Sequence, residues 1–580
     1  MEPVRYTLSF PAPHTHYVDV RATIDTGGAD VIELMMPVWT PGSYLVREFS
    51  RHVEAVMARS SEGRALRIEK ARKNRWRVET GAATQAIVEY RVYGREMSVR
   101  TNWIDADFAL LNGAPTFMTP VEALSTAHEV TIEPARGWIR SFTALPAIGQ
   151  HRYLADDFDR LVDSPILVGN AAAYEFSIDG TPHVLVNEGE AGIFDGTLAA
   201  RDVQRIVRQY KEMWGTLPYQ RYVFLNLITE AGGGLEHADS CVLMTTRWTT
   251  RTRRAYLGWL GLVSHEFFHV WNVKRLRPAE LGPFDYEREN HTRNLWVAEG
   301  FTDYYTDLMV HRAGLSTTEE YLEALSSKIE SLQTTPGRLV QSATGASFDA
   351  WIKHYRPDEN SANTSISYYT KGAVLAFLLD ARIRAASAGM RSLDDVVLQA
   401  YAEYSGDHGF TSDQIRSLIE RVAGESLDAF WRDAVDGTSE LDYTRALETF
   451  GLTFRPAARL IPAKAWLGAT LRNDAGRLLI SQVRRGGPAH AAGVNVDDEV
   501  IAIDGIRVRA DRVDERLEQY RNGDRVVIVI ARRERLLSLP LVFGEEPVRQ
   551  WQLHVAPGAS ALQSAQLARW LNGSVADLNA

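Results

Sequence analysis

Residues 263–272 read VSHEFFHVWN and contain the most informative pattern in the chain. His265 and His269 are one helical turn apart, so both imidazoles lie on the same face of a helix and converge on one ion. Glu266, one step round the helix, reaches a water on that ion. Two histidines amid so much apolar sequence need a partner or a ligand. The pattern therefore predicts a metal site with its own general base.

A second stretch, LWVAEGFTDYY from Leu295 to Tyr305, supplies the remaining metal ligand. A catalytic zinc has three protein ligands and one open position. Glu299 completes a two-histidine, one-carboxylate set, and Asp303, one turn on, is expected to hold a ligand imidazole by its free N–H. We expect one Zn²⁺ per chain, although these ligands also suit cobalt or manganese. Cys241, the single cysteine, excludes a cysteine-based cluster and is expected to be a buried small hydrophobe.

Length and charge narrow the class of protein further. The 580 residues suggest two to four domains, and 64 lysines and arginines against 74 aspartates and glutamates give a net charge of −10. With no block of basic residues, we expect no nucleic-acid partner. No apolar run is long enough to span a membrane, and no secretory signal is visible. The expected location is the cytoplasm, with the periplasm left open in case a leader has been removed.

Hydrophobic periodicity divides the chain into four parts and predicts a multidomain α+β protein. The predicted parts are a β-rich N-terminal domain (1–172), a mixed and largely helical catalytic domain (173–455), a small β module (462–545) and a tail helix (546–580) that stops at Gly573. Within the catalytic domain, the pattern predicts one helix over 201–215 and another over 253–274. The β module should contain a helix over 511–520.

Several motifs together carry a family resemblance. HExxH followed by EGFTDYY resembles the gluzincin (thermolysin-like) metallopeptidases, although the 29 residues between His269 and Glu299 are more than in the large aminopeptidases of that group. HEFFHVWNVKRLRP (265–278), GGGLEH (232–237), WTPGSYLVREFSRHV (39–53) and a PDZ-like C-terminal module resemble the glycyl aminopeptidase family over essentially the whole chain. The resemblance implies a thermolysin-like catalytic domain and a zinc aminopeptidase that prefers N-terminal glycine and then alanine.

The same resemblance assigns substrate-binding residues. GGGLEH lies between two predicted strands, where an extended peptide can pair with a sheet edge and where Gly233 and Gly234 allow close approach of backbone. By resemblance, Glu236 binds the free α-amino group of the substrate. Tyr369, within YTKG, donates a hydrogen bond to the oxyanion, with the adjacent Tyr368 as the alternative.

The C-terminal module resembles a bacterial PDZ domain, with its Φ-G-Φ loop at Leu467, Gly468 and Ala469. Such domains add a peptide strand beside that loop. Whether the groove binds a ligand or the domain only props the catalytic cleft stays open at this point. Two other functions also stay open: a zinc endopeptidase, and a PDZ-based peptide-binding protein whose metal domain is inactive.

Overall fold

The computed structural model describes residues 2–455, 465–546 and 550–572. The chain divides into two compact units. The first contains Met1–Thr292, Tyr305–Ser316 and Val396–Ile415, and the second contains Arg293–Tyr304, Thr317–Asp395 and Arg416–Ala580. Each is described by itself below.

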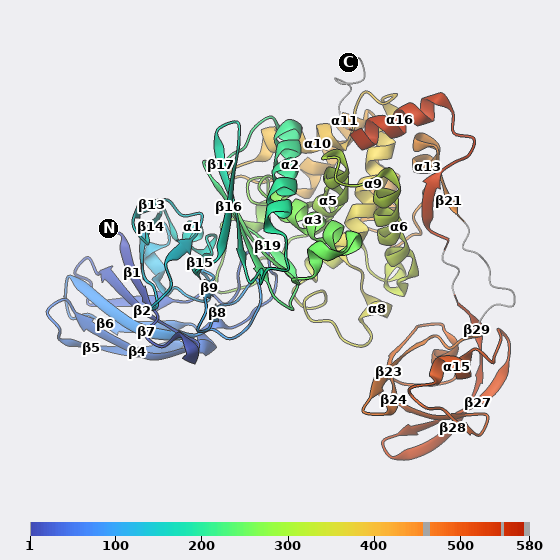
Figure 1. Ribbon diagram of the computed structural model, residues 1–580, viewed down its shortest axis with the longest axis horizontal. Coiled ribbons are helices and arrows are strands. Elements are labelled where there is room, and N and C mark those ends of the chain that lie inside the picture. The colour runs from blue at the N-terminus through green and yellow to red at the C-terminus, as the bar shows by residue number, and fades with distance from the viewer. Residues whose placement is uncertain (1, 456–464, 547–549, 573–580) are drawn as a thin grey trace. The chain divides into compact units, whose positions relative to one another are not determined.

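The first unit begins with a β domain, shown in blue in Figure 1. Its main sheet has the order β10-β3-β6-β5-β4-β7-β2-β1-β11-β14-β13. Buried and less buried residues alternate along β7, so one face of the sheet packs on a single core. The strands of this sheet are β1 (Val4–Ser9), β2 (Tyr17–Asp25), β3 (Val31–Met35), β4 (Val53–Ser60), β5 (Ala65–Arg72), β6 (Arg75–Glu79), β7 (Gln85–Tyr93), β10 (Thr119–Pro120), β11 (His128–Glu133), β13 (Ala147–Gly149) and β14 (Arg152–Ala155).

A smaller sheet follows in the same domain, in the order β12-β15-β9-β8. Its strands are β8 (Trp103–Ile104), β9 (Ala109–Leu111), β12 (Arg140–Phe142) and β15 (Ile166–Gly169), and the short helix α1 (Phe158–Val162) precedes β15. The prediction of a β-rich N-terminal domain is thus confirmed.

A third sheet, ordered β16-β17-β18-β20-β19, begins the catalytic region. It contains β16 (Ala172–Ile178), β17 (Thr181–Glu188), β18 (Tyr222–Ile228), β19 (Gly233–Glu236) and β20 (Ser240–Thr245), and it packs with α2 (Gly196–Trp214) and α3 (Arg253–Phe268). Every residue of β18 is buried, as expected for a strand between two parallel neighbours. GGGLEH contributes β19, which is an edge strand of this sheet and contacts α3.

Two predicted helix limits are wrong. Helix α2 begins at Gly196 and not at Arg201, because the carboxylate of Asp195 caps it by accepting the Leu198 N–H at 2.9 Å. Helix α3 ends at Phe268, and His269 is its C-cap. The chain beyond closes tighter turns, such as Val270 N–H to Phe267 O, so the predicted continuation to Lys274 does not form.

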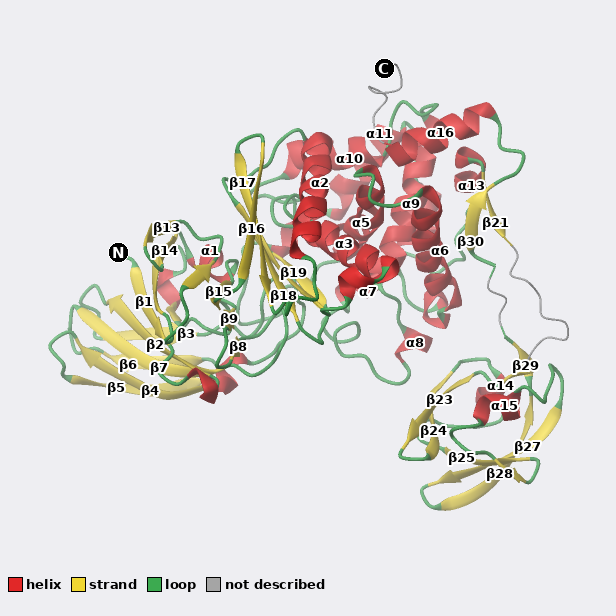
Figure 2. Cartoon of the chain, viewed as in Figure 1, coloured by secondary structure: helices red, strands yellow, loops and turns green. Residues whose placement is uncertain are grey.

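The second unit is mainly helical, as the helix colouring of Figure 2 shows. Its long helix α9 is buried along most of its length and contacts α4, α6, α7 and α13. The helices of the region are α4 (Leu295–Ala298), α6 (Thr318–Thr334), α7 (Ala343–Phe348), α8 (Ser361–Thr364), α9 (Tyr368–Ala386), α12 (Asp428–Phe430) and α13 (Thr444–Phe450). Three further helices contribute residues to both units: α5 (Gly300–Arg312), α10 (Leu393–Tyr404) and α11 (Ser412–Ala423).

The C-terminal module has its own core and a sheet ordered β23-β24-β25-β27-β28, with β26 paired to β25. Its elements are β22 (Ala465–Trp466), β23 (Ala469–Asp474), β24 (Arg477–Val483), α14 (Pro488–Ala491), β25 (Glu499–Ile503), β26 (Ile506–Arg507), α15 (Val513–Leu517), β27 (Arg525–Arg532), β28 (Arg535–Val542) and β29 (Gly544–Glu545). Helix α15 is shorter than the predicted 511–520 and lacks a side-chain cap at its start.

The end of the described chain returns to the second unit's helical part. Strand β30 (Gln552–Val555) pairs with β21 (Leu452–Arg455), and α16 (Ala561–Asn572) follows as predicted. The predicted stop at Gly573 and the predicted gap at 456–461 lie outside the described residues. The limits assigned to the four parts stay predictions. None of the described helices combines the length and the apolar character needed to cross a membrane.

Candidate metal centre and active site

His265 and His269 lie one turn apart at the C-terminal end of α3, with ring centroids separated by 4.8 Å. His269 Nδ1 is 2.7 Å from the carbonyl oxygen of Asn272. A carbonyl only accepts, so Nδ1 carries the hydrogen and the lone pair of the neutral ring lies on Nε2. His265 Nδ1 is held 3.1 Å from the hydroxyl of Thr306. Both imidazoles are thus oriented through Nδ1, the arrangement typical of histidines that bind a metal through Nε2.

Two groups of ligand-type side chains occur in the part of the chain that the structure describes. His265, His269 and Glu299 form one group, and Glu236, Glu266 and His269 form the other; within each, the ligand atoms lie within 4.8 Å of one another. The first group contains the two imidazoles and one carboxylate that suit a catalytic zinc site. Glu299 is the buried C-cap of α4, 1% exposed. The donor set therefore fits a divalent transition metal.

Glu266 is buried beside the edge strand β19. A Cβ placed on Gly234 would lie 2.0 Å from Glu266 Oε1 and 2.4 Å from its Cδ. Such distances are far shorter than any real contact, so only glycine at this position leaves the carboxylate where it is. GGGLEH thus lies directly against the predicted general base.

Glu236, at the end of β19, is only 4% exposed. Its Oε1 atom has no hydrogen-bond partner among the described residues. Gly42 approaches it so closely, at a φ of +83°, that a Cβ there would lie 2.5 Å from Oε1. A buried carboxylate oxygen without a donor, grouped with a second carboxylate from Glu266, attracts a cation. An ammonium group matches this environment.

A cavity of about 240 Å³ adjoins Glu236 within the first unit. Its wall includes Trp39, Gly42 and Tyr44 from the N-terminal WTPGSY motif, together with Asp163 and Lys274. In the sequence, WTPGSY was identified only as part of the family resemblance, with no role in the site, and Asp163 was not identified. The motif itself was a usable signal, whereas Asp163 belongs to no pattern that marks a site.

Tyr368 and Tyr369 begin α9 in the second unit, with their rings stacked at 4.7 Å. Tyr368 is fully buried, and Tyr369 is largely buried. Burial, reinforced by the charge of Glu299, raises the pKa of the Tyr369 phenol well above its ordinary value. The phenol therefore keeps its proton at neutral pH and can donate a hydrogen bond.

Asp303, on α5, accepts a hydrogen bond from Lys328 Nζ at 2.7 Å. The hydroxyl of Thr306, three residues further along the same helix, contacts His265 Nδ1. Thr306 and the Asn272 carbonyl were not identified from the sequence, because neither a lone threonine nor a backbone oxygen stands out in a pattern.

Three parts of the chain match known protein families. Residues 5–170 match the Peptidase M61 N-terminal domain, residues 258–375 the M61 glycyl aminopeptidase family, and residues 459–530 the PDZ domain. A crystal structure of an aminopeptidase N family protein from Idiomarina loihiensis is similar over 98% of this chain and 100% of its own, with 29% identity and a TM-score of 0.91.

An M1 zinc metallopeptidase mutant from Deinococcus radiodurans, bound to a Tyr-Ser-Ala substrate, is 13% identical over 76% of this chain and 95% of its own, with a TM-score of 0.46. No curated protein sequence matches the chain.

The protein is a peptidase of the metallo-aminopeptidase class. Its matches to the M61 N-terminal domain, the M61 glycyl aminopeptidase family and the PDZ domain confirm the resemblance inferred from the sequence. Both of its functional modules are of kinds that bind peptides.

Proposed function

We propose that the enzyme is a zinc aminopeptidase that removes one small residue, preferably glycine or alanine, from peptides with a free N-terminus. His265, His269 and Glu299 are the proposed zinc ligands. Glu266 is the proposed general base, and Glu236 the proposed ligand of the substrate amine.

The separation between Glu236 and Glu266 carries the aminopeptidase assignment. Their carboxylate oxygens lie within 4.8 Å of each other. In one amino-acid residue, the amine nitrogen and the carbonyl carbon are two bonds apart, about 2.5 Å. One residue therefore fits between an amine held by Glu236 and a carbonyl attacked beside Glu266. A second residue would add about 3.8 Å, so the spacing favours release of single residues over endopeptidase cleavage.

Zinc is favoured by the donor chemistry. Two neutral imidazoles and a carboxylate with one open position suit it better than they suit calcium or magnesium, which prefer oxygen ligands. When bound, zinc supplies Lewis acidity for the scissile carbonyl and lowers the pKa of a bound water. Thr306 and the Asn272 carbonyl fix the ring orientations of the two histidines before any metal binds.

The chain's own side chains move and hold the remaining groups. Glu266 accepts a proton from the attacking water and delivers it to the leaving amine. Glu236 neutralises the ammonium of the first residue, and the protonated phenol of Tyr369 donates to the carbonyl oxygen as it gains negative charge. Gly233 and Gly234, on edge strand β19, offer backbone for pairing with the extended substrate. The role of Asp303 as a partner of a ligand imidazole stays a prediction.

The preference for glycine is supported by the family match, and that for alanine rests on the resemblance inferred from the sequence; the preference is the finest part of the proposal. A pocket that merely tolerates an extra methyl group discriminates by about 1–3 kcal/mol, whereas a wall that clashes rejects larger side chains more strongly. Values of kcat/KM for glycyl, alanyl, leucyl and arginyl p-nitroanilides measure it. Leucyl or arginyl substrates in first place would refute the preference and leave the aminopeptidase class intact.

The PDZ domain offers a second peptide site. Strand β23 is an edge strand of its sheet and follows the loop at Leu467–Ala469, so an added peptide strand can pair with it. Titration of labelled C-terminal peptides into the full-length enzyme tests whether this groove binds a ligand.

Glu266→Gln tests the mechanism directly. The variant should keep one zinc per chain, because both imidazoles remain, and should lose kcat at least about a hundredfold, because the base is gone. Metal analysis and a glycyl p-nitroanilide assay on the same preparation measure both quantities. Turnover near the wild-type value, with zinc in place, would overturn the assignment of Glu266.

A further inference from the structure

We infer that Asp163, in the N-terminal β domain, is a positioning residue for the substrate amine: it holds the turn that carries Glu236. The inference rests on the proposed role of Glu236 and extends it to a domain outside the catalytic region. Asp163 directly follows helix α1 and caps its C-terminal end.

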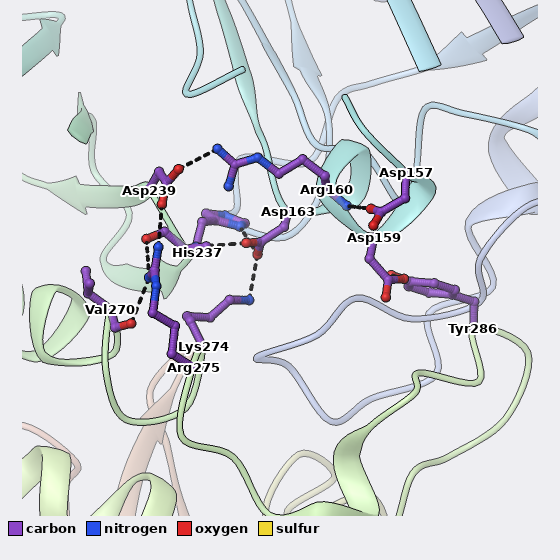
Figure 3. A network of polar contacts seen from close by, with 11 residues as sticks. Asp157, Asp159, Arg160, Asp163, His237, Asp239, Val270, Lys274, Arg275 and Tyr286 are labelled. Atoms are coloured by element: carbon purple, nitrogen blue, oxygen red, sulfur yellow. Dashed lines mark hydrogen bonds and ion pairs between the residues drawn. The ribbon is translucent and has the colours of Figure 1, made fainter. Parts of the chain in front are cut away.

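Asp163 forms hydrogen bonds with the two residues that directly follow Glu236. One carboxylate oxygen is 3.0 Å from Nδ1 of His237, and the other accepts the N–H of Ala238 at 2.8 Å. Figure 3 shows this carboxylate with His237 on one side and Lys274 on the other. Because His237 is only 2% exposed, its ring has little freedom to move away. The chain direction at the end of β19 is therefore set from the N-terminal domain.

Lys274 supplies the opposite charge, with its Nζ donating to Asp163 at 2.6 Å. Burial alone would raise the pKa of Asp163, but Lys274 and His237 more than offset that effect and hold the pKa well below its ordinary value. The N–H of Lys274 in turn bonds the carbonyl of His269. One carboxylate thus connects the strand end bearing Glu236 with the segment that follows the metal-binding helix.

The rest of the turn is fixed independently. Asp239 accepts hydrogen bonds from Arg160 at 2.5 Å and from Arg275 at 2.8 Å, and Arg275 also donates to the Ala238 carbonyl at 3.0 Å. These contacts appear together in Figure 3. Since Asp239 is held without Asp163, loss of the Asp163 contacts should loosen the residues next to Glu236 without unfolding the turn.

The placement of Glu236 depends on its backbone, because its Oε1 atom has no hydrogen-bond partner among the described residues that would hold the carboxylate in place. Gly42 approaches it closely, and both residues line the cavity. A misplacement of about 1 Å in such a site can cost a hundredfold in the interaction that it makes. Asp163 should therefore affect ligands with a free amine and spare those without one.

The test uses two small metal-binding compounds that differ only in an amino group. Glycine hydroxamate carries the free amine, and acetohydroxamate has hydrogen in its place. Calorimetry on the full-length zinc enzyme gives the Kd of each compound. The Kd of acetohydroxamate divided by the Kd of glycine hydroxamate, called the Kd ratio below, reports the contribution of the amine subsite. Zinc content and melting temperature are measured on each variant.

Asp163→Asn preserves shape but leaves only one acceptor oxygen for three donors. We expect the Kd ratio to fall at least about tenfold, with acetohydroxamate affinity and zinc content unchanged. Glu287→Gln is the matched control, because it breaks another partly buried ion pair between the β domain, at Arg75, and the chain that follows it, and touches neither Glu236 nor its turn. Its ratio should equal that of the wild type.

Asp163→Asn also leaves the positive charge of Lys274 unpaired near the amine, and this charge could itself weaken amine binding. The double variant Asp163→Asn with Lys274→Met removes that charge, so any loss that remains comes from the position of Glu236. If Asp163 positions Glu236, the ratio stays low in the double variant. Recovery of the wild-type ratio there, or equal weakening of both hydroxamates by Asp163→Asn, would overturn the inference. Glu236→Gln tests the proposed amine site separately from its positioning by Asp163: an unchanged Kd ratio in that variant refutes the amine site itself.

Discussion

A single methyl group at Gly234 should disable the general base without touching the metal. A Cβ at this position would lie 2.0 Å from Glu266 Oε1 and 2.7 Å from its Cγ. The backbone of Gly234 has an ordinary negative φ and pairs with Leu243 in β20, so alanine fits the strand itself. The whole conflict therefore falls on the Glu266 side chain.

The size of the effect follows from these distances. Ordinary van der Waals contact begins at about 3.4 Å, so Glu266 Oε1 must move by about 1.4 Å, the difference between 3.4 and 2.0 Å. A displacement of about 1 Å in a reacting group can cost about a hundredfold in rate. Gly234→Ala should therefore lower kcat about a hundredfold and keep one zinc per chain.

Gly232→Ala is the matched control. It changes the glycine two residues earlier in the same motif, at a position where a Cβ meets nothing within 4 Å and the φ is not left-handed. Steady-state kinetics on glycyl p-nitroanilide, with zinc content and melting temperature for both variants, compare the two substitutions. Gly232→Ala should retain close to wild-type kcat.

A double-mutant cycle gives the sharpest refutation. If Gly234→Ala acts only through the base, it should add almost nothing to the loss already caused by Glu266→Gln. Full additivity of the two losses, or a kcat for Gly234→Ala within about twofold of the wild type, would show that the close approach of β19 to Glu266 does not govern catalysis.

Two other predictions concern the metal and the stability of the second unit. Glu299→Ala should lower zinc occupancy after dialysis, as measured by metal analysis, since a third ligand is lost; full retention of zinc would mean that the third ligand lies elsewhere. Burial lowers the pKa of Lys371 from its ordinary 10.5 to about 8. At pH values between 8 and 10.5, Lys371 binds a proton in the unfolded chain but not in the folded chain. The free energy of unfolding of the wild type, relative to that of Lys371→Met, should therefore rise by up to roughly 3 kcal/mol from pH 8 to 10.5. Melting temperatures across that range measure the effect, and parallel curves would contradict it.

The sequence predicted elements of the fold well where their hydrophobic pattern was long and regular. The β-rich N-terminal part and the C-terminal helix α16 have long, regular patterns, and both occur as expected. The errors fall at helix ends. The start of α2 depends on one capping hydrogen bond of Asp195, and the end of α3 depends on tight turns after Phe268, neither of which alters the hydrophobic pattern.

The candidate site divides in the same way. His265, Glu266 and His269 were found because their spacing is a local property of one helix. Asp163 and Gly42 were missed as contributors because they act from a different domain: Asp163 contacts His237, 74 positions away, and Gly42 approaches Glu236, 194 positions away. A contact of that kind exists only through the tertiary fold, and nothing in the spacing of an aspartate or a glycine announces it.

Strand β19 explains why GGGLEH is glycine-rich before its glutamate. Successive side chains of a strand point to opposite faces, so Gly234 and Glu236 share one face. That face approaches Glu266 at Gly234, where any side chain would displace the base, and two residues later it bears the carboxylate proposed for the amine. A strand that must both clear the base and carry an acid on the same side can do so only with a glycine at the first position and a longer residue at the second. The order of residues in the motif is therefore dictated by the pleat of the strand, which also pairs Glu236 with Cys241 of β20.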